Sequence, residues 1–148
     1  MARPTPSQRR DSLWTLPLDV RWGDADMLGH INNATYFTYS ESARIAFFAE
    51  VFGPTINNFD GDGPILADIG CSFHRQVRFP AALDIGVQIV RIGSSSLEIH
   101  SPMFLRGEDT AVADVRSVLV WFDYRAQKPA PVPSILQRYL VTAESNAG

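Results

Sequence analysis

The chain has 148 residues, enough for one compact domain and too few for two comfortable ones. Its 45% hydrophobic and 20% charged residues are ordinary for a soluble protein, and no apolar run approaches the roughly eighteen residues that a membrane span needs. A net charge of −3 argues against nucleic-acid binding, which depends on a basic surface.

Residues 1–12 are polar, contain prolines and show no periodicity, so we expect a flexible lead-in before a single domain at residues 13–148. The basic N-terminus is not followed by the apolar segment of a secretory signal, which predicts a cytoplasmic protein and no membrane partner. The single cysteine, Cys71, excludes an internal disulfide and a cysteine metal cluster, and its apolar neighbours favour a core position.

A first strand is predicted at Leu16–Trp22. Asn32 and Asn33 can cap a helix that runs to about Phe52, where Gly53-Pro54 stops it. Apolar side chains cover most of the circumference of this helix, so we expect it to be wrapped on several sides, as a curved sheet would do.

The rest of the chain supplies such a sheet. A loop rich in Gly and Asp is expected at Asn57–Pro64, and a short terminal helix at Pro133–Glu144. Four long strand-like segments joined by short turns lie between them, which favours antiparallel pairing and an α+β fold. They are Ile65–Phe79, Leu83–Ile92, Ser96–Arg106 and Ala111–Tyr124.

The most informative segment is RWGDADMLGHINNATY, residues 21–36. It places two carboxylates, Asp24 and Asp26, a few residues before the expected helix. The N-terminus of a helix carries unpaired N–H groups and a partial positive charge that can polarise a carbonyl oxygen. This arrangement aims an acid at a helix N-terminus that can polarise a carbonyl oxygen.

This segment resembles the start of the hotdog-fold acyl-CoA thioesterases of the 4-hydroxybenzoyl-CoA thioesterase family, whose pattern is D-x-D-x-x-G-H-[VI]-N-N-x-x-Y followed by E-x-[AS]-R. The resemblance extends over most of the chain, through Cys71–Pro80, Gly93–Ser96, Lys128-Pro129 and Val132-Pro133. It implies a single hotdog domain, an antiparallel sheet wrapped around a long central helix. It also implies hydrolysis of an acyl-CoA thioester to a carboxylic acid and free CoA, with no cofactor.

The resemblance assigns roles to individual residues. Asp26 would attack the thioester or activate water, and the backbone N–H of Asn33 would polarise the carbonyl. The local alternatives are a turn aspartate that caps backbone N–H groups, and a simple helix cap. Asp24 is predicted to support the loop, and Gly29 to give a backbone conformation that lets substrate pass closely.

Two further side chains could share the chemistry. His30 could bind substrate, transfer a proton or simply orient the loop. Glu41 lies about two turns into an otherwise apolar helix, where a buried carboxylate needs a partner or a task. It could pair with Arg44, or it could act in catalysis, because a second hotdog thioesterase subfamily keeps its catalytic Glu at a roughly equivalent helix position.

Thirteen basic residues include a single lysine, and arginine is the better bidentate partner for phosphate. His74, Arg75 and Arg78 are candidates for the phosphates of CoA. Strand alternation would place Arg75 and Arg78 on opposite faces, so one contact is enough. The three histidines lack metal-binding spacing, so no metal site is predicted.

Two alternatives remain open. One is a hotdog hydratase or dehydratase, although its N-P-x-H and H-F-P motifs are absent, and the other is a non-catalytic acyl-CoA-binding protein. An open sheet edge and a partly exposed helix predict association with further copies, and the resemblance implies a homodimer or homotetramer with the site between subunits.

Overall fold

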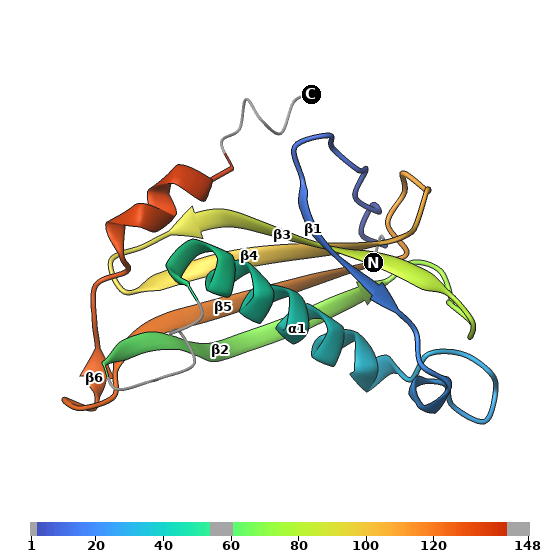
Figure 1. Cartoon of the computed structure of the whole chain (residues 1–148), viewed down its shortest axis with the longest axis horizontal. Helices are drawn as coiled ribbons and strands as arrows, with labels where there is room; N and C mark the ends of the chain where they lie inside the picture. Colours follow the sequence, from blue (N-terminus) through green and yellow to red (C-terminus); the bar gives the residue numbers. More distant parts are fainter. Residues whose placement is uncertain (1–2, 54–60, 142–148) are drawn as a thin grey trace.

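Alternating apolar residues in successive segments build one antiparallel sheet of six strands, with a long helix on one face (Figure 1). The computed structural model describes residues 3–53 and 61–141. The elements are β1 (Trp14–Asp19), η1 (Trp22–Asp24), α1 (Asn33–Phe52), β2 (Asp62–Phe73), β3 (Ala82–Ile92), β4 (Ser96–Leu105), β5 (Ala113–Asp123), β6 (Lys128–Pro129) and η3 (Ser134–Tyr139).

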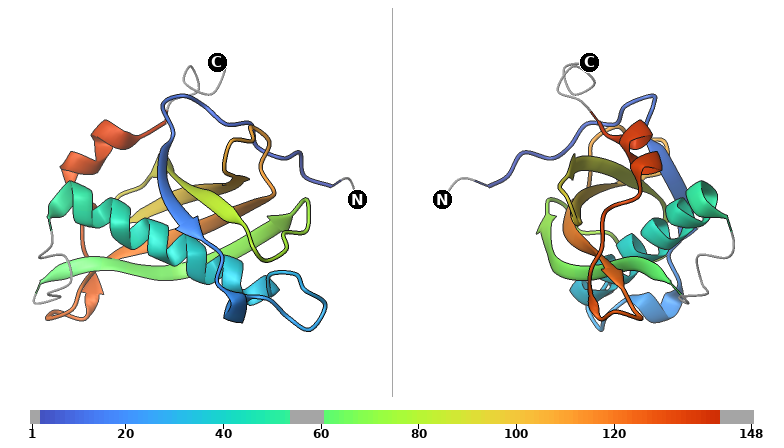
Figure 2. Two further views of the ribbon diagram at one scale, coloured as in Figure 1. Left: turned by 45° about the vertical axis from the view of Figure 1, so that its right-hand side comes forward. Right: turned by 90° about the vertical axis from the view of Figure 1, so that its left-hand side faces the viewer.

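The strand order is β1-β3-β4-β5-β2, with β6 beside β5. Consecutive strands β3, β4 and β5 are neighbours, whereas β2 lies at the far edge because α1 separates it from β1 in the chain. The sheet curves around α1, as the end view in Figure 2 shows. The predicted α+β hotdog architecture is confirmed. No helix in the described ranges is long and apolar enough to cross a membrane.

The face of the sheet that α1 covers forms the core. On β3 the inward residues Leu83, Ile85, Val87 and Ile89 are buried. From the helix, Phe47 and Phe48 pack against aromatic rings of the two strands on either side of the sheet. The ring centroids lie 5.5 Å apart for Trp14–Phe47 and 6.1 Å apart for Phe48–Trp121.

The helix is covered over most of its circumference, because partly buried residues such as Phe37, Val51 and Phe52 pack against the core beside the fully buried ones. Its buried residues recur every three or four positions, from Tyr36 through Ala43 to Phe48. Ile45, on the opposite side, is 50% exposed. The expectation of a helix wrapped on several sides is therefore confirmed, and a narrow face that includes Glu41 and Ile45 stays exposed.

Some predicted boundaries also differ. The first strand is Trp14–Asp19, because Arg21 to Asp24 form a short 3₁₀ turn. The next strand ends at Phe73 instead of Phe79, and residues 74–81 form a loop that includes a cis Phe79–Pro80 bond. The terminal helix is the 3₁₀ segment Ser134–Tyr139, and positions 142–144 of the predicted helix lie outside the described residues. Positions 57–60 of the predicted loop Asn57–Pro64 also lie outside them, and the loop prediction is wrong for its last three residues, because β2 begins at Asp62.

Residues 3–12, the predicted lead-in, run beside the segment that joins β4 and β5 (Figure 2). The backbone of Ser7 accepts a hydrogen bond from Ala111, and Arg9 donates one to the carbonyl of Asp109. These contacts fix where the segment lies in the structure. Its flexibility, and the domain boundary at residue 13, stay predictions.

Candidate active site

The first half of the loop between β1 and α1 is anchored by Asp24. One carboxylate oxygen, Oδ2, accepts hydrogen bonds from the Arg21 N–H at 3.0 Å and the Tyr39 hydroxyl at 2.7 Å. The other oxygen lies 3.3 Å from the Arg21 guanidinium. Burial opposes ionisation of Asp24, but the hydrogen bonds from Tyr39 and Arg21 outweigh it and lower the pKa of the carboxyl.

Asp26 organises the second half of the loop. Its Oδ1 accepts hydrogen bonds from the N–H groups of Leu28 at 2.9 Å and His30 at 3.3 Å, and its own N–H donates to the His30 carbonyl at 2.7 Å. The second carboxylate oxygen has no hydrogen-bond partner in residues 3–53 and 61–141. Asp26 thus caps its turn through Oδ1, as the local alternative predicted, and its other oxygen is not used by the turn.

The tight turn depends on Gly29, which has a φ of +82°. Side chains rarely adopt this left-handed conformation, so glycine is needed here. An added Cβ would also lie 3.7 Å from Nη1 of Arg78, so this guanidinium is next to the turn. Gly29 accordingly shapes the loop that carries Asp26.

The helix begins beside this loop. The Asn32 side chain accepts a hydrogen bond from Ala34 at 3.0 Å, and its carbonyl accepts one from Thr35 at 2.9 Å. Asn32 is therefore the cap, and Asn33 is the first helical residue. The N–H of Asn33 has no acceptor within the described part of the chain, as expected for the first turn of a helix.

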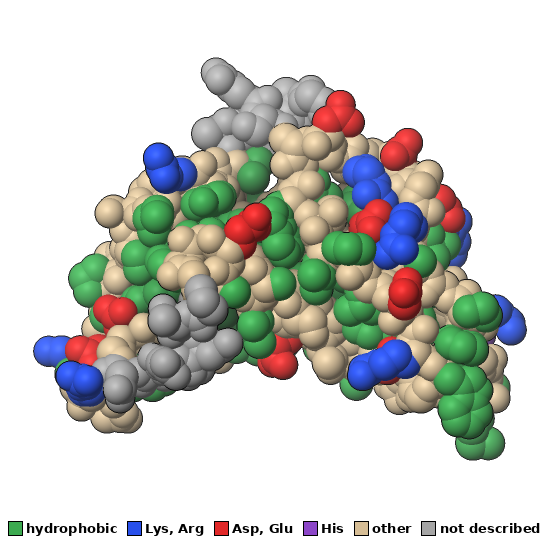
Figure 3. All heavy atoms as spheres, viewed as in Figure 1, with side chains coloured by type: hydrophobic (Ala, Val, Ile, Leu, Met, Phe, Trp, Pro, Cys, Tyr) green, Lys and Arg blue, Asp and Glu red, His purple; other side chains and the backbone are tan. Residues whose placement is uncertain are grey.

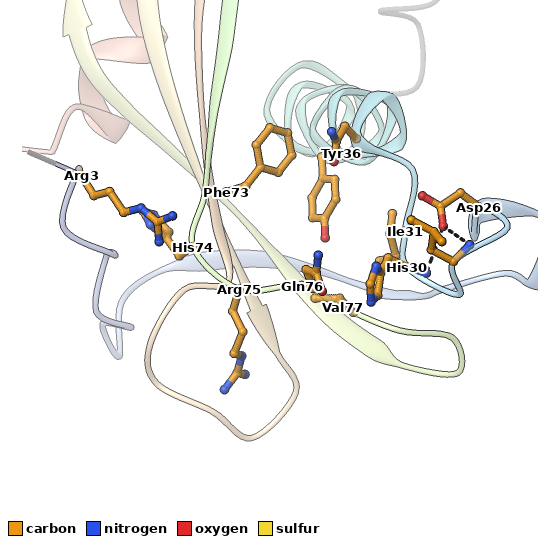
Figure 4. Close-up of a pocket in the computed structure, with 12 residues that line it drawn as sticks. Arg3, Asp26, His30, Ile31, Tyr36, Phe73, His74, Arg75, Gln76 and Val77 are labelled. Atoms are coloured by element: carbon orange, nitrogen blue, oxygen red, sulfur yellow. Dashed lines mark hydrogen bonds between the residues drawn. The ribbon is translucent and has the colours of Figure 1, made fainter. Parts of the chain in front are cut away.

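Asp26, His30 and Asn33 line one cavity of about 530 Å³. Tyr36 and Phe73, with ring centroids 5.2 Å apart, form part of its wall. Burial, followed by the proximity of Cys71, raises the pKa of Tyr36 to about 12. The cavity continues past the end of β2 to His74, Arg75, Gln76 and Arg3 (Figure 4).

His30 lies in this wall with Nε2 buried and without a hydrogen-bond partner among the described residues. A buried imidazole nitrogen without a partner is costly unless a ligand or water satisfies it. His30 therefore holds the loop through its backbone and leaves one buried ring nitrogen unsatisfied at the cavity wall.

The structure does not bring every predicted residue to the cavity. Glu41 is exposed and does not line it. The buried charge on this part of the helix is Arg44, whose Nη1 donates to Ser40 at 3.2 Å. Burial lowers the pKa of Arg44, and Glu41 partly offsets this effect without forming an ion pair within 4 Å. The expectation of a buried Glu41 is wrong because the buried stripe falls on the neighbouring helical positions.

The expected strand positions of Arg75 and Arg78 are also wrong, since β2 ends at Phe73. Arg75 lines the cavity and pairs with Glu108 at 2.7 Å. Arg78 is exposed beside Gly29, outside the set of cavity-lining residues. The prediction that the two side chains lie on opposite faces rested on alternation along a strand. Alternation does not apply to a loop, so this prediction has no basis here.

Sequence reasoning did not assign a site role to Arg3, Tyr36 or Gln76, which all line the cavity. Tyr36 was within reach of the sequence, because it is the last residue of the D-x-D motif. Arg3 and Gln76 carry no local signal, since only the tertiary fold brings them to the end of β2.

A long helix across a curved antiparallel sheet, with an acid beside the first turn of the helix, defines the hotdog class of thioesterase domain. A family model for the thioesterase-like superfamily matches residues 20–140, and the chain belongs to that superfamily. The resemblance inferred from the sequence is confirmed.

Solved structures agree with this assignment. The PA5185 protein of Pseudomonas aeruginosa strain PAO1 is 29% identical, with a TM-score of 0.83 over 91% of this chain and 94% of that one. A thioesterase from Thermus thermophilus, complexed with coenzyme A and Zn, is also 29% identical, with a TM-score of 0.71 over 86% and 96% of the two chains. The uncharacterized protein YsmA of Bacillus subtilis (strain 168) is 36% identical over 83 residues, which span about half of each chain, 56% of this one and 55% of YsmA.

Proposed function

We propose that this protein hydrolyses acyl-CoA thioesters, with Asp26 as the catalytic carboxylate and the Asn33 N–H as the oxyanion donor. One observation carries the proposal. The carboxylate of Asp26, with one uncommitted oxygen, and the helix N-terminus at Asn33, with an N–H that lacks an acceptor in the described residues, line the same cavity.

Two routes use this arrangement. In the first, the free oxygen of Asp26 attacks the thioester carbon, the C–S bond breaks, CoA leaves as its thiolate, and water hydrolyses the mixed anhydride. In the second, Asp26 takes a proton from water as the water attacks the same carbon, and the tetrahedral intermediate then collapses with cleavage of the C–S bond and departure of CoA as its thiolate. In both, negative charge develops on the carbonyl oxygen and is stabilised by the Asn33 N–H and the helix dipole.

The remaining predicted residues take supporting roles in this proposal. Asp24 holds the first half of the loop, Gly29 permits the turn, and His30 contacts substrate through its unpartnered nitrogen. Arg75 and Arg78 are proposed to contact the phosphates of CoA. The complex of coenzyme A with a relative that is 29% identical supports the substrate class.

We further propose that the protein is cytoplasmic and works as a homodimer or homotetramer. Among the described strands, the edge strand β2 pairs only with β5, on its inner side. Three hydrophobic residues of this strand, Ile65, Leu66 and Phe73, are exposed. An unpaired strand edge with exposed apolar side chains is suited to a second copy, which would place Phe73 and the cavity close to the subunit boundary. Light scattering of the purified protein tests this association.

Thiol release from a panel of acyl-CoA esters, aliphatic and aromatic, tests the activity. Each reaction is followed in parallel by thiol appearance and, for enoyl-CoA, by loss of the conjugated double bond. Thiol release that saturates with substrate supports the hydrolase. Loss of the double bond without thiol release would identify a hydratase, and saturable binding with neither change would identify a binding protein.

A further inference from the structure

The segment that precedes β1 brings a cationic side chain to the cavity. Residues 3–13, here called the N-terminal arm, cross the end of the sheet, and Arg3 at the start of the arm is one of the cavity-lining residues. Figure 4 shows Arg3 and Asp26 on opposite sides of the chain segment that carries Phe73 to Val77. The cavity therefore has its carboxylate at one end and the arm at the other.

Arg9 holds the arm to the sheet. Its Nη1 lies 3.0 Å from Asp84, its Nε donates to the Glu108 carbonyl at 3.0 Å, and its guanidinium carbon lies 4.6 Å from the centroid of the Phe104 ring. The Asp84 carboxylate is largely buried, so this pair is stronger than an exposed ion pair. Leu13 adds an apolar contact, since its side chain fills the space where a Cβ on Gly86 would lie.

A second anchor connects the arm directly to the cavity wall. The backbone N–H of Ser7 donates to Asp114 at 3.1 Å, and the same carboxylate contacts Nε2 of His74 at 2.8 Å and Nε2 of His100 at 2.9 Å. Burial opposes ionisation of Asp114, but the hydrogen bonds from His100, Ser7 and His74 lower its pKa strongly. His74 also lines the cavity. Asp114 therefore links the backbone of Ser7 to a residue of the cavity wall.

The chain between Ser7 and Arg3 is stiff. It contains Pro4 and Pro6, whose rings fix φ and remove two backbone donors. A short segment of this kind loses little conformational entropy when it contacts a ligand. A side chain at its end can therefore bind the ligand at small entropic cost.

Arg3 differs in charge balance from the other arginine of the cavity. Arg75 already pairs with the carboxylate of Glu108 at 2.7 Å, across a half-exposed contact. Arg3 has no ion pair with any residue in the described ranges, although it lines a cavity that holds one carboxylate at its far end. A guanidinium without a counter-ion at the mouth of a cavity favours an anionic ligand, and phosphate groups match its planar donor geometry.

We infer that the N-terminal arm is part of the substrate site and that Arg3 binds the phosphate groups of the nucleotide portion of CoA while Asp26 faces the thioester. This inference rests on the proposed function for the identity of the ligand. It assigns the arm a role as a positioning element, since Arg9 and Ser7 act on the ligand only by holding Arg3.

Calorimetric titration with CoA, dephospho-CoA and pantetheine tests the inference without requiring turnover. Arg3→Ala should weaken the binding of CoA about 5- to 10-fold and leave pantetheine binding unchanged, because pantetheine lacks the nucleotide phosphates. Retention of the loss with dephospho-CoA assigns Arg3 to the pyrophosphate, and its disappearance assigns Arg3 to the 3′-phosphate. Arg125→Ala, at the opposite end of β5, is the matched control for charge and should bind all three compounds as the wild type does.

A double-mutant cycle tests the positioning role. Arg9→Ala should weaken CoA binding about 3-fold, and the Arg3→Ala/Arg9→Ala variant should bind CoA no more weakly than Arg3→Ala alone, because both changes remove one contact. Unchanged CoA binding by Arg3→Ala, an absence of CoA binding by the wild type, or additive losses in the cycle would overturn the inference. CoA binding that depends on Arg3 in a protein without thiol release would refute the hydrolase and leave the arm's role intact.

Discussion

The two halves of the loop between β1 and α1 each carry one carboxylate, in opposite situations. Asp24 is buried, and both its oxygens are occupied by Arg21 and Tyr39. Asp26, two residues later, is exposed and keeps one oxygen uncommitted. The same side chain therefore serves as an anchor in one place and as a candidate catalyst in the other, and the surroundings decide between the two roles.

Asp26→Asn should have the largest effect on catalysis and little effect on stability, unlike a change at Asp24. Asparagine keeps the size and the accepting oxygen that caps the turn, so the fold should persist, but it is neither a nucleophile nor a base. We expect kcat to fall by about 10²- to 10⁴-fold with the melting temperature nearly unchanged. Thiol release and thermal melting of the same preparation measure both quantities, and a normal kcat would exclude Asp26 as the catalyst.

The next largest effect is expected at Asn33, whose backbone and not its side chain is proposed to act. Asn33→Pro removes the N–H, and the first helical position tolerates proline. Asn32 has ψ of 134°, the conformation that a residue before proline prefers. Turnover should fall by about 10²-fold in a folded protein. Asn33→Ala keeps the N–H and serves as the control, so similar losses in both variants would refute the oxyanion role.

Asp24→Asn tests the anchored half and should act on stability. Replacing an acceptor of several hydrogen bonds by an amide leaves a donor facing donors, at an expected cost of about 1–3 kcal/mol in the free energy of unfolding. Since folding lowers the pKa of Asp24, its contribution is present above the unfolded pKa of about 4 and is lost as the pH falls through the folded value. The gap in stability between wild type and Asp24→Asn, measured by urea unfolding, should therefore narrow below about pH 4. A gap that widens in acid would contradict this role.

Glu41→Gln should have the smallest effect. Glu41 is exposed and outside the cavity, and its interaction with Arg44 is not a close ion pair. We expect kcat within about twofold of the wild type and stability within about 0.5 kcal/mol. A loss of turnover comparable to that of Asp26→Asn would show that Glu41 reaches substrate in the assembled oligomer, and would move the catalytic centre onto the helix.

The fold was largely predictable because its signals are local. Asn32 and Gly53 mark the ends of α1, and the observed helix Asn33–Phe52 matches the prediction. The turns at Gly93-Ser94 and after Leu105 separate strands that agree with the predicted ones within one or two residues. Caps, turns and alternation act over a few residues, so one sequence contains them.

The predictions failed where the structure of a segment depends on residues far from it in the sequence. The apolar residues after Phe73 continue the strand pattern, but β5 begins at Ala113, the partner of Phe73. Beyond that pair the chain leaves β5, and the Val77 carbonyl accepts a hydrogen bond from Ile31 in the loop before α1. Glu41 and Arg44 are both charged residues in an apolar helix, and only the direction of the sheet determines which one is buried. The place of Arg3 depends on contacts more than one hundred positions along the chain, such as Ser7 with Asp114.

The exposed tip of the loop has a spectroscopic consequence. Figure 3 shows hydrophobic side chains projecting at this end of the molecule. In the loop, Trp22 is 79% exposed, and Met27 and Leu28 are exposed as well. Of the three tryptophans, Trp121 is buried and Trp14 is partly buried against the core, so Trp22 should emit as the most hydrated indole. In a variant with Trp14 and Trp121 replaced by Phe, the emission of Trp22 would report directly on the loop that carries Asp26, shifting to shorter wavelength when a ligand or a second subunit covers the tip.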